Sequence, residues 1–299
     1  MPRETPALKP INSRSPLRLI WDLLSETYKE WQQDNAQTLG AALAFYATFS
    51  IAPMLIIVIA VFGVILGKET VQAEILRRTQ DLIGTQGADV VGKMISAAYR
   101  PGSGLSATII GILVIVIGST SALVMLKQAL NIMWGVETAT KVSVWNLIKE
   151  RLLSFIMILV IGFLLMLSMM VSVALSFVSA FLQNWMPVPI FFIQMSDWCL
   201  SILLVTLLFA MVFKILPDVK IAWSDVWVGS IFTAILFTLG KFLFALYLAR
   251  SSIRSAYGAA SSLAVILIWV YYSAQVLFFG AELTRVYANR YSSRVKPRA

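Results

Sequence analysis

Long apolar stretches, separated by short charged segments, dominate the pattern of this chain. No Asp, Glu, Lys or Arg lies between Asp34 and Lys68, and comparable stretches recur along the rest of the sequence. A helix needs about 20 predominantly apolar residues to cross the hydrocarbon core of a membrane. The pattern therefore predicts an all-α, polytopic membrane protein with six transmembrane helices, at about residues 36–66, 105–126, 152–182, 193–216, 226–249 and 260–281.

The residues before the first span follow a different pattern. Residues 1–15 are rich in Pro, Arg and Ser, a composition that predicts a disordered tail. Residues 16–33 carry apolar side chains at helical spacing and charges on the other face, so they predict an amphipathic helix too polar to span. Such a helix either lies along the membrane interface or packs against the six-span membrane domain, residues 34–285.

Residues 68–100 interrupt the series of spans. Two short amphipathic segments flank the sequence GTQG, and PGSG at 101–104 precedes the second span. This arrangement predicts a helical hairpin outside the bilayer, on the extracytoplasmic (periplasmic) side.

Composition and charge agree with a membrane protein and suggest its orientation. The chain is 59% hydrophobic and only 13% charged, whereas a soluble domain carries about 25% charged residues. Most of the 24 Lys and Arg residues lie in segments that are cytoplasmic if the N-terminus is inside. The positive-inside rule therefore favours two cytoplasmic termini. The basic tail, residues 286–299, would then face anionic lipid, which we favour over binding to nucleic acid.

The side chains that most enzymes and metal sites use are scarce. There is one cysteine, Cys199, and no histidine, so the commonest general base and the commonest metal ligand are missing. No P-loop or dinucleotide-binding glycine pattern occurs either. We expect no enzymatic activity, no metal site and no cofactor.

Lys241 is the charge that we expect deepest in the membrane. It lies within the fifth predicted span, at the depth of Tyr271 or Tyr272 on the sixth and of Ser168 or Ser172 on the third. A charge in the bilayer indicates a functional site. The sequence leaves two alternatives open, a water-lined cavity around Lys241 or an ammonium group that reaches outward to the interface.

Other polar side chains recur on single helix faces. Tyr271, Gln275 and Glu282 share one face of the sixth span, which we expect to point to the interior of the bundle. Tyr46 and Ser50 on the first span are candidate neighbours of this face. A serine stripe on the third span, at 168, 172, 176 and 179, predicts a close-packing seam or the wall of a pore.

Four charged residues are predicted at one depth, at the inner ends of their spans. These are Asp34, Lys127, Glu282 and Arg285. One hypothesis is an inner-face cluster in which Asp34 and Lys127 pair with Glu282 and Arg285. The alternatives are that each lies alone at the interface, or that Glu282 and Arg285, one helical turn apart, pair with each other.

Several segments resemble one known family. The stretch YGAASSLAVILIWVYYSAQVLFFGAELTRVYA resembles the C-terminal signature of the YihY/virulence factor BrkB family. AALAFYATFSIAPML, ALNIMWGVE and GKFLFALYL resemble its first, second and fifth spans, and the match covers residues 20 to 290. The resemblance implies a six-span protein of the bacterial inner membrane. Members carry virulence-factor labels and an old ribonuclease BN label, and transport of a lipid or small solute has been suspected for them.

The residues argue against the nuclease label, because metal-dependent RNA cleavage needs clustered histidines and carboxylates that this sequence lacks. Our first hypothesis is a transporter or flippase-like protein for an anionic lipid or small solute, with Lys241 attracting the anionic group. The second is a scaffold or regulator of envelope assembly or virulence that docks partners on the 68–100 hairpin and the cytoplasmic tail. A homo-oligomer is compatible with either hypothesis.

Overall fold

The computed structural model describes residues 16–98, 105–136, 148–149, 151–164, 166–167, 170–171, 190–250, 261–291 and 296–297, and these are almost entirely α-helical. The long helices are α1 (Pro16–Gln33), α2 (Ala36–Leu66), α3 (Lys68–Ala98), α4 (Leu105–Met133), α6 (Ile190–Ile215), α7 (Trp223–Arg250) and α9 (Ser261–Tyr291). A shorter apolar helix covers Arg151–Leu164. Two short strands, β1 (Val219–Lys220) and β2 (Lys296–Pro297), pair antiparallel.

Four of the described helices are long and apolar enough to cross a membrane. These candidate spans are Ala36–Leu66, Trp198–Ile215, Trp223–Leu248 and Leu263–Tyr291. Large apolar side chains on their outer faces are exposed, for example Val64 at 82% and Phe242 at 62%. Such exposure of apolar surface fits contact with lipid. The prediction of a helical membrane protein is therefore confirmed, and much of the predicted third span, 152–182, lies outside the described residues.

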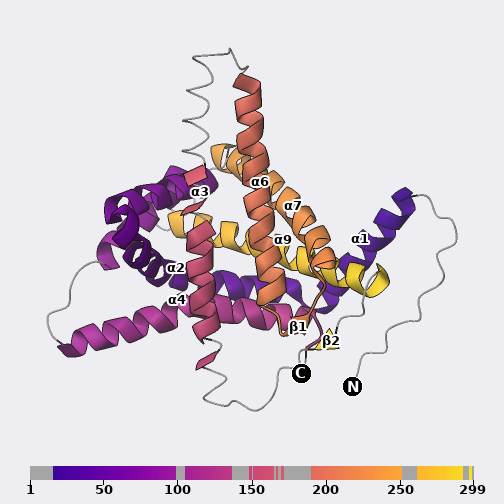
Figure 1. Ribbon diagram of the computed structural model, residues 1–299, viewed down its shortest axis with the longest axis horizontal. Helices are drawn as coiled ribbons and strands as arrows, with labels where there is room; N and C mark the ends of the chain where they lie inside the picture. Colours follow the sequence, from indigo (N-terminus) through magenta and orange to yellow (C-terminus); the bar gives the residue numbers. More distant parts are fainter. Residues whose placement is uncertain are drawn as a thin grey trace.

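The helix α9 lies at the centre of the bundle. It contacts α1, α2, α3, α4 and α7, and Figure 1 shows it in yellow, passing between α2 and α7. It also continues ten residues beyond the predicted end of its span, because Leu283, Val286 and Ala288 extend its buried face. The first residues of the predicted basic tail, 286–299, form the last part of α9, which packs against α1.

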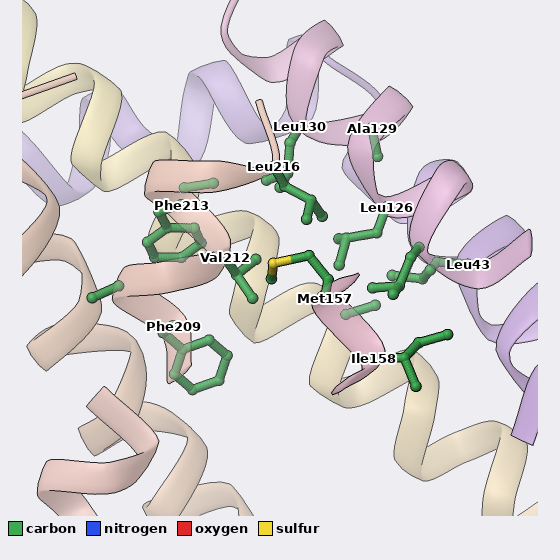
Figure 2. Close-up of a cluster of buried hydrophobic side chains, with 14 of the residues drawn as sticks. Leu43, Leu126, Ala129, Leu130, Met157, Ile158, Phe209, Val212, Phe213 and Leu216 are labelled. Carbon is green, nitrogen blue, oxygen red and sulfur yellow. The ribbon is translucent and has the colours of Figure 1, made fainter. Parts of the chain in front are cut away.

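The largest apolar core of the described residues draws on several helices, among them α2, α4, the Arg151–Leu164 helix, α6 and α9. Figure 2 shows Met157 between Leu126 of α4 and Val212 of α6, with Phe213 beside them. The helix α4 itself runs to Met133, past the predicted end of its span at residue 126. Leu130 and Met133 in this extension are fully buried, so the same core fixes the position of the α4 C-terminus.

The α3 segment is two helical limbs joined at one residue. Gly84 has φ of 76° inside α3 and interrupts the helical geometry there. A residue without Cβ adopts this left-handed conformation at little cost. The second limb begins near the predicted GTQG turn, and Ile83 at the junction packs against Phe244 of α7 and Trp269 of α9.

Candidate functional site

Arg285 of α9 gathers acidic side chains from two other segments of the chain. Its guanidinium lies 3.2 Å from the Glu30 carboxylate of α1 and 3.2 Å from the Asp34 carboxylate in the α1–α2 link. It lies 3.4 Å from the Glu282 carboxylate, one turn earlier in α9. It also donates a hydrogen bond to the Met133 carbonyl at the end of α4. We call Glu30, Asp34, Glu282 and Arg285 the polar junction.

Burial makes this arrangement unusual. The side chains of Asp34 and Glu282 are 0% exposed, Arg285 is 15% exposed and Glu30 is 28% exposed. Among the described residues, the Glu282 Oε1 atom has no hydrogen-bond partner. Removing charges from water costs several kcal/mol per ion unless partners compensate for it. The polar junction therefore places three acidic groups around one guanidinium, at a position where water does little to compensate their charges.

Local backbone structure brings these groups together. Asn35 adopts a left-handed conformation, φ 52°, between α1 and α2, and asparagine tolerates this conformation better than most residues. The resulting turn sets Asp34 beside Arg285. At the end of α4, Gly135 with φ of 64° turns the chain away. The last carbonyls of a helix have no intrahelical partner, and Met133 offers one of them to Arg285.

A second ionic group lies at the same end of α4. The Lys127 ammonium is 2.9 Å from the Asp218 carboxylate, which also accepts a hydrogen bond from the Asn131 amide at 3.0 Å. The Asn131 side chain in turn accepts from the Asp218 backbone N–H. The structure thus brings Asp34, Glu282 and Arg285 together, and the ion pair that it shows for Lys127 is to Asp218.

Gln275 faces α2, as the predicted polar stripe requires. Its amide donates to the Ala36 carbonyl at 3.3 Å, and its side chain packs on the Cα of Gly40. Its Oε1 atom is buried and has no hydrogen-bond partner in the part of the chain that the structure describes. Any side chain larger than hydrogen at position 40 would collide with this amide. Gln275 thus supports close contact between α2 and α9.

The predicted neighbours on α2 point elsewhere. Ser50 is buried and accepts a hydrogen bond from the Ala122 N–H of α4. Tyr46 is 44% exposed and makes an edge contact with the Phe45 ring. Tyr271 is also exposed, with its ring edge against Gly40. Tyr271 thus shares the contact at Gly40 with Gln275. Ser168 and Ser172 lie outside the described residues.

Lys241 lies on the inward face of α7. Phe237, Phe244 and Leu248, which share its helix face at spacings of four, three and seven, all pack in the cluster around Trp269. The Tyr272 ring fills the space beside Gly240, and its hydroxyl donates to the Leu236 carbonyl at 3.2 Å. Among the described residues, the structure shows no ion pair or hydrogen bond of the Lys241 ammonium.

Sequence reasoning missed Glu30 and Asp218. Glu30 was assigned to the solvated face of the amphipathic helix, although its position four residues before Asp34 places both near one side of the α1–α2 link. Asp218 follows Pro217 in a short loop, where nothing in the sequence pattern indicates a partner on α4. In the described part of the chain no group of three His, Cys, Asp or Glu residues has metal-binding geometry.

Comparison with known proteins gives relatives along most of the chain. A UPF0761 membrane protein of Mannheimia succiniciproducens is 24% identical over 265 residues, covering 88% of this chain and 88% of the relative. One of Actinobacillus pleuropneumoniae serotype 5b is 26% identical, covering 86% of this chain and 90% of the relative. One of Ralstonia nicotianae is 25% identical, and there the chain spans only 55% of the relative. No solved structure matches.

The family model described as virulence factor BrkB covers far more than the C-terminal signature. It matches residues 27–299, which include α2, α4, α7, α9 and the whole polar junction. The resemblance found in the sequence is thereby confirmed, and the chain belongs to the virulence factor BrkB family.

Proposed function

We propose that this protein is a transporter or flippase-like protein for an anionic lipid or small solute in the inner membrane of a bacterial cell. It crosses the membrane six times, with both termini in the cytoplasm and the α3 hairpin on the periplasmic side. It catalyses no reaction on its substrate and binds no nucleic acid. The position of Lys241 on the inward face of α7 is the observation that supports this proposal best.

The position of Lys241 argues for a ligand. A lysine that merely anchors a span reaches outward along the lipid-facing surface, but Lys241 shares its face with the buried Phe244 and the partly buried Phe237. Lys241 is half-buried, and an ammonium within a span is costly unless an anion compensates for it. A phosphate or carboxylate of a substrate meets that need in a transporter, and the surrounding aromatic rings contact its apolar part.

Tight helix seams limit the route that a substrate takes. Gly229 and Gly280 pack against Thr284 and Thr233 across the α7–α9 contact, and a Cβ at either glycine would overlap the facing hydroxyl. Gly40 closes the α2–α9 contact in the same way. These seams occupy the half of the bundle near the polar junction. In the other half, the Tyr272 ring closes the α7–α9 contact at Gly240 in the same way. We therefore place the substrate site beside Lys241 and outside these seams.

Reconstituted vesicles test this function. The full chain is inserted into liposomes, and movement between leaflets is followed for dye-labelled phosphatidylglycerol and, in parallel, for equally labelled phosphatidylcholine. We expect the protein to accelerate movement of the anionic lipid, and Lys241→Met to slow it about tenfold or more, which corresponds to about 1.4 kcal/mol. Lys241→Arg keeps the charge and is expected to retain most of the rate.

Lys93→Met is the matched control, since Lys93 is an exposed lysine of α3 that pairs with Asp89. It should transport like the unmodified protein. Thermal unfolding of every variant shows whether a lost rate reflects a lost fold. A folded Lys241→Met variant with an undiminished rate contradicts the proposed role of this lysine.

One observation favours the scaffold function as a second candidate. A groove of about 1010 Å³ opens between the limbs of α3, lined by charged and polar side chains that include Arg77, Asp89 and Lys93. Such a groove suits docking of a peptide segment of an envelope protein. A scaffold requires the groove and tolerates Lys241→Met, so paired substitutions at the two places separate the candidates in a virulence or envelope-integrity assay.

A further inference from the structure

We infer that the polar junction is a proton-binding site, in which the buried carboxyl groups of Asp34 and Glu282 share one proton beside Arg285. This inference deepens the proposed function by naming a coupling ion, and that coupling role rests on the proposed transport. The occupancy of the site by a proton does not depend on transport.

The balance of charge supports one bound proton. Glu30 is partly exposed, so water as well as Arg285 compensates the charge of its carboxylate. Asp34 and Glu282 are fully buried and both lie against the same guanidinium. One guanidinium compensates one of these two charges. Two ionised carboxylates that share one guanidinium away from water are more costly than one carboxylate beside a neutral, protonated acid.

The geometry of the two acids fits a shared proton. Their side chains are within hydrogen-bonding reach of each other. Two ionised carboxylates only accept hydrogen bonds, so a favourable contact between them requires a proton on one. The Glu282 Oε1 atom, buried without a partner, remains as a second position for that proton.

Arg285 is the cation that the structure shows beside Glu282 among the described residues. Charged groups on the neighbouring helices have other partners. From α4, the Met133 carbonyl brings a partial negative charge to Arg285, and the ammonium of Lys127 pairs with Asp218. From α1, Glu26 pairs with Arg290 of α9 at 3.3 Å.

Another neighbour, α7, meets α9 through Gly229 and Thr284, and its first turn holds the buried Asp225. The acidic groups that the structure shows beside Arg285 and Glu282 are Glu30 and Asp34. A metal cation is a poorer candidate than a proton, because a guanidinium already occupies the centre of the junction.

Infrared spectroscopy of the full chain in lipid nanodiscs tests the site directly. A protonated carboxylic acid has a C=O stretching band that ionised carboxylates lack and that shifts in D₂O. We expect this band at neutral pH, its disappearance as the pH is raised, and its loss in Glu282→Gln. Asp34→Asn should shift or remove the same band, because it takes away the partner of the shared proton.

Glu74→Gln is the control, since Glu74 is an acidic residue of α3 held by two arginines. It should leave the band unchanged. Glu282→Asp keeps a carboxyl group and serves if Glu282→Gln does not fold. A band that is absent at neutral pH, or that persists unchanged in both junction variants, overturns the inference. Loss of the band on addition of Na⁺ at constant pH also overturns it, because the site would then bind a metal cation.

The result is separable from the proposed function. A band assigned to Glu282 in a protein that moves no lipid supports the proton site and refutes transport of that lipid. Lipid movement dependent on Lys241, without such a band, supports transport and refutes the proton site.

Discussion

The polar junction and the first limb of α3 use the same residue types in opposite proportions. In α3, Arg77 and Arg78 both bind the Glu74 carboxylate, at 2.7 Å each. In the junction, a single Arg285 serves three carboxylates at 3.2 to 3.4 Å. The α3 group joins residues three and four positions apart on one helix, whereas the junction joins α1, the α1–α2 link, α4 and α9.

Exposure separates the two groups as much as charge does. Arg77 and Arg78 are 53% and 30% exposed, so water screens their ion pairs. The junction is shielded, so each of its charges depends on the others. The ratio of cations to carboxylates, together with burial, therefore separates a minor surface feature from an ionic group whose charges depend on one another.

Arg285→Met should give the largest effect. It leaves the buried acids without their guanidinium and the Met133 carbonyl without its donor. Removing one partner from a buried ion pair costs about 3–5 kcal/mol. We expect a large fall in the thermal unfolding temperature in detergent, or failure to accumulate in the membrane. The same change at Arg77 should cost no more than about 1 kcal/mol, and equal losses at the two positions would contradict the comparison.

Arg285→Lys sharpens the same contrast with an intermediate effect. Lysine keeps the charge, but its compact ammonium does not reproduce the planar fork that spans Glu30, Asp34 and Met133. We expect a loss of about 1–3 kcal/mol, the usual cost of hydrogen bonds to charged groups, in unfolding measurements. Arg77→Lys in α3 is the control and should be nearly neutral, because Arg78 still binds Glu74.

The sequence predicted the helices better than it predicted the contacts between their ends. The run without charge from Asn35 to Gly67 predicts α2 within a residue of its bounds, because length and apolarity are sufficient for a span. The sequence predicts the end of the sixth span at residue 281, because Glu282, Arg285 and Arg290 look like residues leaving a membrane, and α9 runs on to Tyr291. Their helix continues because α1 covers it, and no local pattern reveals that cover.

The same limit applies to partners in the candidate site. Equal depth placed Asp34 near Arg285, and the structure shows that ion pair. Depth gave no way to choose between Glu282 and Asp218 for Lys127, because that choice depends on how the loop after Pro217 lies against α4. Lys241 was found from its position within a span, but its inward orientation follows only from the packing of Phe237 and Phe244.

The smallest effect that we predict is the acid response of α3. Burial alone would raise the pKa of the Glu74 carboxyl, but hydrogen bonds from Arg77 and Arg78 and their charges outweigh burial and hold that pKa below its ordinary value. A group with a lowered folded-state pKa contributes stability above its unfolded-state pKa and loses it as the pH falls through the folded value. We therefore expect the protection of α3 backbone amides against hydrogen exchange, corrected for intrinsic rates, to decline only in acid. Glu74→Gln should remove this decline. The polar junction, as a proton site, should instead lose its contribution to stability as the pH rises. A decline of α3 on the alkaline side would show that the two ionic groups do not differ as their charge ratios require.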